Sequence, residues 1–253
     1  MLRSLALRRV DVFARRGLAA GALLLAACTP ATAPLEVVAR RPVVPPAPIR
    51  LHHRNLTKLP AKAQGVPRVL FVADSIAAGF GLPAGAQPYP SILAARLAAE
   101  DGLAIEVLNG GIFGFTTSGG LVLEQLGSLQ PDIVVIELGG NDFLQGLDLE
   151  RTRQNLRDMV AAARGMGARV LLVGVRLPGF LLRTERGRDF DRLYPELAAE
   201  LDVPLVVDMY EDALGNPRFM QADSIHPTAE GQKVVAENVL PQLREVVRQA
   251  LGR

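Results

Sequence analysis

From Arg68 onward, short aliphatic runs alternate with longer segments of helical periodicity. The runs are almost continuously apolar, as strands buried on both faces of a sheet are. They cover Val69–Ala73, Ile105–Leu108, Asp132–Leu138, Arg169–Val175 and Pro204–Met209, and the helical segments cover 90–100, 118–129, 149–165, 189–201 and 227–251. Strands that alternate with helices of this length pair in parallel through right-handed crossovers. The alternation therefore predicts an α/β fold: a three-layer α/β/α sandwich with a parallel sheet of about five strands.

Polar and glycine-rich segments follow three of these strands. The first strand is followed by Asp74-Ser75, the second by a loop that contains Gly114, and the third by Gly140-Asn141-Asp142. Ligands of parallel sheets bind beyond the carboxyl ends of the strands. A serine at a strand-to-helix turn directs its Oγ toward that crevice, and glycines let backbone N–H groups approach a ligand. Each segment alone is equally typical of a helix cap or a tight turn.

The last segment of this kind, Asp223 to Pro227, distinguishes between these interpretations. His52 and His53 precede the predicted strands, so His226 is the one histidine of the alternating region. Asp223 lies three residues earlier and can accept from Nδ1–H of His226, which leaves Nε2 to face a nucleophile. A serine, a histidine and an aspartate at one edge of a sheet predict a serine hydrolase.

The four segments resemble the sequence blocks of the SGNH (GDSL) hydrolase family. Asp74-Ser75 is similar to the nucleophile block, Gly114 to the glycine block, Gly140-Asn141-Asp142 to the asparagine block, and Asp223 with His226 to the final block. The resemblance covers residues 68–250 and is strongest to the bacterial arylesterases and multifunctional thioesterase/lysophospholipases. The chain departs from the family pattern in having Ala73 before Asp-Ser and Ile76 after it, where the family has glycine and leucine.

The resemblance implies a flavodoxin-like SGNH fold and a serine esterase that cleaves aryl esters, acyl-thioesters or lysophospholipids through an acyl-enzyme. Ser75 would attack the carbonyl, His226 would act as the general base, and Asp223 would orient His226. The oxyanion hole would consist of the Ser75 and Gly114 backbone N–H groups and the Asn141 side chain.

Several supporting roles and alternatives belong with this interpretation. Asp74 is expected to support the nucleophile turn, and apolar side chains near the strand ends are candidates for an acyl or aryl pocket: Phe113, Phe115, Leu177 and Phe180, with Ile76 and Phe80. We expect no cofactor and no metal, because the one histidine of the predicted domain, which contains no cysteine, is too few for a typical zinc site. The alternatives are a carbohydrate O-deacetylase on the same fold, a non-catalytic lipoprotein binding module, and a flavodoxin-like ligand-binding domain.

The N-terminal segment has the pattern of an export signal. A basic stretch, residues 1–16, precedes the apolar run 17–27, which is shorter than the roughly 20 residues that a membrane-spanning helix needs. The run ends in Leu25-Ala26-Ala27-Cys28, which resembles the lipobox of bacterial lipoproteins and implies cleavage before Cys28 and lipidation of its sulfur. An ordinary signal peptide with a chance cysteine is the alternative.

The charge distribution supports a division of the chain into three segments. Residues 1–66 carry eleven Lys and Arg and two acidic residues, a net charge of +9, whereas residues 67–253 have a net charge of −7. The basic surplus therefore does not indicate nucleic-acid binding by the domain. We expect a signal peptide over 1–27, a proline-rich basic tether over 28–66 and the hydrolase domain over 67–253. The mature chain would be a monomer, anchored by Cys28 to a bacterial membrane, preferably the outer membrane, and facing the periplasm.

Overall fold

The computed structural model describes residues 43–45, 47–51 and 61–252. The predicted signal peptide, Cys28 and much of the predicted tether lie outside these residues. The sheet has six parallel strands in the order β1-β3-β2-β4-β5-β6. The strands are β1 (Ile49–Arg50), β2 (Arg68–Ala73), β3 (Glu106–Asn109), β4 (Ile133–Glu137), β5 (Arg169–Val173) and β6 (Leu205–Val206).

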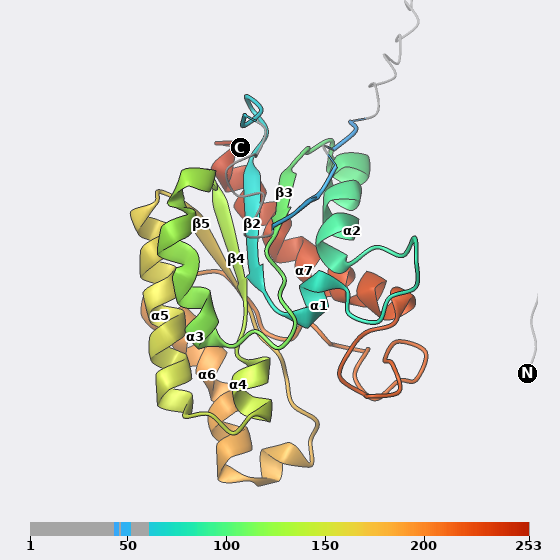
Figure 1. The fold of residues 1–253 in the computed structure, drawn as a ribbon, viewed down its shortest axis with the longest axis vertical. Helices are drawn as coiled ribbons and strands as arrows, with labels where there is room; N and C mark the ends of the chain where they lie inside the picture. The colour runs from blue at the N-terminus through green and yellow to red at the C-terminus, as the bar shows by residue number, and fades with distance from the viewer. Residues whose placement is uncertain (1–42, 46, 52–60, 253) are drawn as a thin grey trace, which may run out of the picture. The chain divides into compact units, whose positions relative to one another are not determined.

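Helices cover both faces of the sheet, which confirms the predicted three-layer fold (Figure 1). Successive side chains of β2 point to opposite faces, as in any strand. Val69 and Phe71 pack with the helices α2 (Tyr89–Arg96) and α7 (Ala229–Ala250). Leu70 and Val72 pack on the other side with α5 (Leu149–Gly165) and α6 (Glu185–Leu201). The near-continuous apolar character of the strand therefore reflects burial on both faces.

The long helices begin at capping side chains. Asp148 accepts from the Glu150 backbone N–H and starts α5, whose bounds agree with the predicted segment. Thr184 accepts from the Gly187 N–H, so α6 begins four residues before the predicted segment. Thr228 caps α7 in the same way. Among the described helices, none combines the length and the apolar character needed to cross a membrane.

Shorter helical elements occupy the connections, where the sequence pattern is weak. The predicted segment 118–129 is divided into α3 (Thr117–Gly120) and the 3₁₀ segment η2 (Leu121–Leu129), and paired glycines at the junction disfavour a continuous α-helix. The others are α1 (Ser75–Ala78), the π-helical segment η1 (Leu97–Asp101), α4 (Gly140–Leu144) and the 3₁₀ turn η3 (Leu181–Arg183).

Strand β1 is the main difference from the sequence expectation. Ile49 and Arg50 belong to the segment expected as a tether, yet they pair with Leu108 and Asn109 of β3. The Leu51 N–H continues this pairing to the Asn109 carbonyl oxygen at 2.9 Å. A strand of two residues is too short to show an alternation of apolar and polar side chains. It can follow a proline because it lies at the edge of the sheet. The sixth strand therefore could not be expected from periodicity.

Candidate active site

Ser75 stands at the carboxyl end of β2, as the first residue of α1. Asp74 caps this helix, because its Oδ1 accepts from the Ile76 N–H at 2.9 Å. The N–H groups at the start of a helix have no intrahelical acceptor, so the Ser75 N–H remains available beside its own hydroxyl. The short helix thus presents a nucleophile and a donor at the same edge of the sheet.

Side chains from three distant parts of the chain hold the C-terminal end of α1. Its last three carbonyl oxygens accept in turn from Gln232 Nε2 at 3.1 Å, from Asn109 Nδ2 at 2.7 Å and from the guanidinium group of Arg50. A helix of four residues has almost no internal hydrogen bonds to fix it. These contacts from α7, β3 and β1 therefore supply the rigidity that a precisely oriented Ser75 requires.

Gly111 lets the loop after β3 approach α1 closely. A Cβ atom on Gly111 would lie 2.5 Å from the Ala78 backbone nitrogen and 2.9 Å from the Asp74 carbonyl oxygen. Both neighbours are backbone atoms that cannot turn aside. Only glycine allows this approach, which keeps the loop that carries Gly114 against the nucleophile turn.

Ser75, His226 and Asp223 form one hydrogen-bonded chain. His226 Nε2 lies 2.9 Å from Ser75 Oγ, and His226 Nδ1 lies 2.7 Å from Asp223 Oδ2. With Nδ1 protonated and donating to the carboxylate, Nε2 is left to accept from the serine hydroxyl. The sequence analysis predicted that these three residues meet, and the geometry agrees with that prediction.

A tight loop brings Asp223 and His226 together. The Gln221 N–H donates to the His226 carbonyl oxygen at 2.7 Å, and Ser224 takes a left-handed conformation with φ of 57°. Asp223 Oδ1 accepts from the backbone N–H groups of Ile225 and His226 at 3.0 Å each. Partial desolvation raises the pKa of Asp223, but these two N–H groups and the His226 ring more than offset it and lower the pKa to about 2. Asp223 is therefore ionised throughout the neutral range.

Asn141 lies beside Asp74, the residue before the serine, and its amide group is already engaged. Its Nδ2 donates to Asp74 Oδ2 at 3.0 Å and to the Phe115 carbonyl oxygen at 3.1 Å. Gly114, one residue before Phe115, is exposed and has a φ of 69°. A ligand oxygen that binds Asn141 would have to replace one of the two protein acceptors.

A buried hydrogen-bond network around Asp142 connects the helices next to Asn141, and the sequence analysis assigned it no role. The Asp142 carboxylate accepts from the Thr117 N–H at 2.9 Å and from Thr152 Oγ1 at 3.1 Å. Asn155 Nδ2 donates to Thr117 Oγ1 at 2.9 Å. The network ties α3, α4 and α5 together, and its only sequence signal was the adjacency of Asp142 to Asn141.

Asp74 contacts a second buried acid, Glu137, to which the sequence reasoning gave no role. Burial raises the pKa of Asp74 to about 6, although the Ile76 N–H, the His226 charge, Glu137 and Asn141 all act in the opposite direction. Burial and the charge of Asp74 raise the pKa of Glu137 well above its usual range. The two buried carboxyl groups therefore lie next to the turn that carries Ser75.

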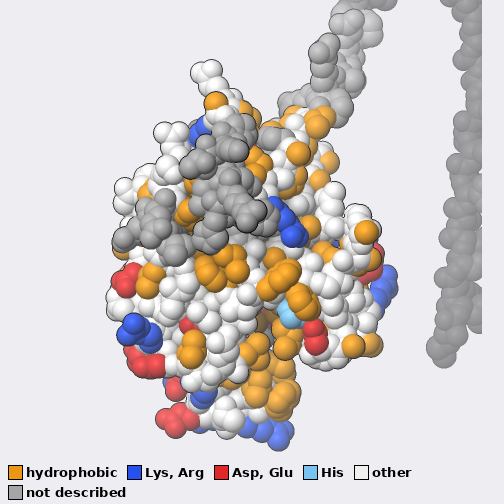
Figure 2. Space-filling model, viewed as in Figure 1, with side chains coloured by type: hydrophobic (Ala, Val, Ile, Leu, Met, Phe, Trp, Pro, Cys, Tyr) orange, Lys and Arg blue, Asp and Glu red, His pale blue; other side chains and the backbone are white. Residues whose placement is uncertain are grey.

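Aromatic side chains surround the exposed edge of His226. The Phe80 ring lies 4.4 Å from the imidazole and 5.2 Å from the Phe113 ring, measured between centroids. Phe113 is 58% exposed and Phe180 is 67% exposed. Figure 2 shows the histidine at the surface between hydrophobic side chains. An apolar group bound near Ser75 would thus meet aromatic surface.

The other pocket candidates lie deeper. Phe115 and Leu177 are partly buried and pack against the core beneath α5 and α6, and Ile76 belongs to the buried core on the opposite face. Their apolar character therefore reflects core packing at least as much as ligand contact.

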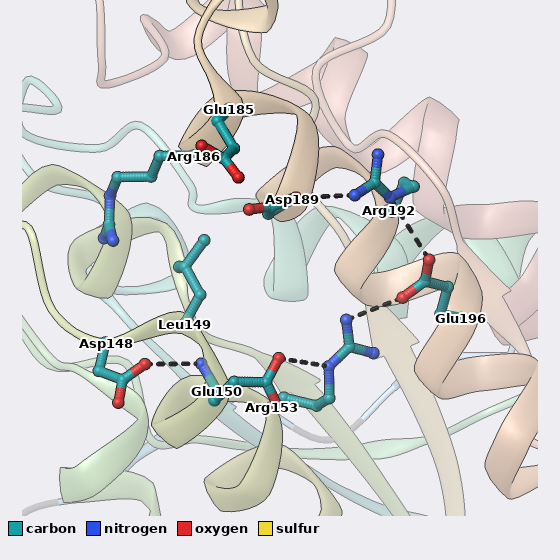
Figure 3. A pocket seen from close by; sticks show the side chains of 9 residues that line it. All are labelled: Asp148, Leu149, Glu150, Arg153, Glu185, Arg186, Asp189, Arg192 and Glu196. Carbon is teal, nitrogen blue, oxygen red and sulfur yellow. Dashed lines mark hydrogen bonds and ion pairs between the residues drawn. The ribbon is translucent and has the colours of Figure 1, made fainter.

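A separate cleft of about 630 Å³ lies between α5 and α6 and is lined mainly by charged side chains (Figure 3). Arg153 is 2.8 Å from Glu196 and 3.7 Å from Glu150, and Arg192 is 2.7 Å from Asp189. Ser75, Asp223 and His226 do not line it. Because these guanidinium groups are paired with carboxylates, the cleft has the character of a helix-to-helix ion-pair network.

Comparison with known proteins connects this site to esterases. Residues 74–234 match the model of the GDSL-like Lipase/Acylhydrolase family. The chain is 40% identical over 182 residues to Esterase TesA of Pseudomonas aeruginosa, covering 71% of this chain and 89% of that protein. It is 34% identical over 194 residues to Thioesterase 1/protease 1/lysophospholipase L1 of Escherichia coli K12, covering 76% and 90%. A crystal structure of TesA aligns with a TM-score of 0.66 at 39% identity, over 71% of this chain and 99% of that one.

Proposed function

The chain belongs to the GDSL-like lipase/acylhydrolase family and is a serine esterase, and from this premise we propose that Ser75, His226 and Asp223 are its catalytic triad. The observation that carries the proposal is the unbroken hydrogen-bonded chain from Ser75 Oγ through His226 to Asp223. Each group has the hydrogen-bond partner that nucleophilic catalysis requires.

The proposed reaction proceeds through two tetrahedral intermediates. Ser75 Oγ bonds to the substrate carbonyl carbon while its proton moves to His226 Nε2, and the C=O electron pair becomes an oxyanion. His226 then protonates the departing alcohol or thiol, which leaves an acyl ester on Ser75. Water attacks this ester, gives its proton to His226, and the carboxylic acid leaves as the proton returns to Ser75. Asp223, ionised throughout, stabilises the imidazolium in both halves.

The proposed oxyanion hole consists of the Ser75 and Gly114 backbone N–H groups and the Asn141 side chain. The position of Asn141 next to Asp74 and Phe115 supports this role. Since both Asn141 N–H bonds have acceptors, we propose that the oxyanion displaces the Phe115 carbonyl oxygen, while the hydrogen bond to the charged Asp74 carboxylate is retained.

The proposed substrates are small acyl esters and thioesters with an apolar acyl or aryl group, such as aryl esters, acyl-thioesters and lysophospholipids. The exposed Phe80 beside His226, with Phe113 next to it, supports an apolar group on this side. The two curated relatives reported above are named as esterase and thioesterase/lysophospholipase. The carbohydrate deacetylase and the binding module gain no such support.

We expect the purified protein to hydrolyse p-nitrophenyl esters of short acids and at least one acyl-thioester or lysophospholipid, with little action on acetylated sugars. The physical reason is the aromatic surface beside the nucleophile, which favours apolar groups over a hydrated sugar ring. Initial rates over a panel of the four substrate classes measure kcat/KM for each. A higher kcat/KM for acetylated sugars than for every aryl ester and thioester would contradict this assignment.

We also propose that the chain is exported and anchored as a lipoprotein through Cys28, with a tether between the anchor and a monomeric domain. The support is the basic-then-apolar N-terminal pattern that ends in Leu25-Ala26-Ala27-Cys28. In bacterial cells that express the full chain, we expect the protein in the membrane fraction, and Cys28→Ser should release it from that fraction. Equal membrane retention of the two proteins would contradict anchoring through Cys28.

A further inference from the structure

Two acidic side chains are buried together at the ends of β2 and β4. Glu137 is the last residue of β4, and its backbone pairs in register with Ala73, the residue before Asp74. Glu137 is 2% exposed and Asp74 is 5% exposed. Neither Asp74 nor Glu137 takes or gives a proton in the reaction proposed above. Their burial therefore needs another explanation, because a buried acid without a role is costly.

The hydrogen bonds of Asp74 connect it to the reaction centre. Its Oδ1 accepts from the Ile76 N–H in the turn that carries Ser75, and its Oδ2 accepts from Asn141 Nδ2. Asp74 thus orients both the nucleophile turn and the proposed oxyanion donor. It can do so only as an ionised acceptor held in one rotamer.

Glu137 has a carboxyl oxygen, Oε2, that is buried and accepts from no donor among the described residues. The two carboxyl groups are within hydrogen-bonding reach of each other, and the Asp74 backbone N–H is also directed at Glu137. Two adjacent buried carboxylates cannot both be ionised. One proton between them turns the repulsion into a hydrogen bond.

The surroundings decide which of the two acids keeps the proton. Asp74 has donors on both oxygens and the His226 ring nearby, whereas Glu137 is the more deeply buried. Burial and the Asp74 charge raise the pKa of Glu137 well above its usual range, while that of Asp74 is about 6. At neutral pH Asp74 is therefore ionised and Glu137 is protonated.

Three buried phenols lie close enough to Glu137 for its charge to act on them. Tyr89 begins α2, Tyr194 belongs to α6, and Tyr210 follows β6. Burial and the negative charge of Glu137 or Asp74 raise the pKa of each of them, so they stay neutral. Besides Asp74, the charged groups that act on this region are Asp142, Asp208, Asp223 and His226.

We propose that Glu137 is a positioning residue, whose protonated carboxyl donates a hydrogen bond to Asp74 and thereby fixes Asp74 in the rotamer that serves Ile76 and Asn141. The inference rests on the proposed roles of Ser75 and Asn141. Glu137 contacts neither the nucleophile nor the substrate. It acts through Asp74, and loss of its proton would place two negative charges side by side and release Asp74.

The test compares Glu137→Gln with Glu137→Met. Glutamine keeps a donor for Asp74 and an acceptor for the Asp74 N–H but cannot ionise, whereas methionine fills a similar volume without a donor. At pH 7 we expect kcat of E137Q within about threefold of wild type and kcat of E137M lower by about 10- to 100-fold, the range of one hydrogen bond to a charged group. KM should stay nearly constant in both variants.

The pH profile gives a readout that a merely structural role would not change. As pH rises through the raised pKa of Glu137, the wild type loses the donated hydrogen bond and its kcat should fall. E137Q has no such proton to lose, so its kcat should remain on the plateau at higher pH. This comparison needs only the E137Q variant and is valid even if E137M does not fold.

Two results would overturn the proposal: an E137Q variant as impaired as E137M, or identical alkaline limbs for wild type and E137Q. Ser75→Ala, assayed in parallel, separates this failure from a failure of the proposed function. Retained turnover in Ser75→Ala would contradict the triad itself. Loss of turnover in Ser75→Ala together with matching alkaline limbs would contradict the role of Glu137 alone.

Discussion

Ser75→Ala is expected to reduce kcat for p-nitrophenyl ester hydrolysis by about 10⁴- to 10⁶-fold, as removal of a nucleophile in a serine hydrolase does. The substitution deletes one oxygen atom, the one that we propose forms the acyl-enzyme. The remaining donors still bind the oxyanion, which leaves a small residual rate above that in water. KM should change little, because Ser75 contributes hardly any ground-state binding.

The triad also predicts how substitutions combine. Ser75 and His226 act as a unit, so the variant that carries both Ser75→Ala and His226→Ala should be no slower than Ser75→Ala within about threefold. Ser128→Ala, an exposed serine of η2, is the matched control and should retain full activity and full labelling by a fluorophosphonate. Labelling of Ser75→Ala at the wild-type rate would contradict the assignment of the nucleophile.

Protonation of Asp223 does not contribute to the acid limb of the pH profile. Its pKa of about 2 keeps it ionised at every pH at which an esterase is normally assayed. Asp74, whose pKa burial raises to about 6, should contribute to a fall of kcat/KM below about that pH. In E137Q, whose amide donates to Asp74 as the protonated Glu137 does, this contribution should stay.

The features of the fold that depend on local sequence patterns could be predicted. Five of the six strands, the three-layer arrangement and helix α5 followed from periodicity. The three-residue spacing of Asp223 and His226 predicted their contact, and the strand ends predicted the approach of Ser75. The catalytic roles of these residues remain predictions, since geometry alone does not measure turnover.

Contacts between distant segments could not be predicted in this way. The carbonyl groups of α1 accept from Gln232, Asn109 and Arg50. No local sequence pattern around these three residues indicates that they bind α1. The contact of Asp74 with Glu137 depends on the register between β2 and β4, which a single sequence does not specify. The residues that make the site rigid are therefore harder to recognise than those that carry the chemistry.

Asn141→Ala should lower kcat by about 10²- to 10³-fold with little change in KM, the effect expected from losing one oxyanion donor. The Asn141 amide is bound to Asp74 and Phe115 in the free enzyme, so substrate binding itself gains nothing from it. Its contribution begins when the carbonyl oxygen becomes charged and replaces the neutral Phe115 acceptor. The cost therefore falls on the transition state.

The substitution also removes two hydrogen bonds inside the protein, and this effect must be separated from the loss of the donor. Asn155→Ala is a suitable control, because Asn155 is buried and its Nδ2 likewise donates to two protein oxygens, at 2.9 Å in Thr117 and 3.2 Å in Ser118. Both variants should lower Tm, since each deletes an amide that donates two hydrogen bonds inside the protein. Only Asn141→Ala should lower kcat by two orders of magnitude or more. Equal losses of kcat in the two variants would mean that Asn141 serves the loop around Phe115 and not the oxyanion.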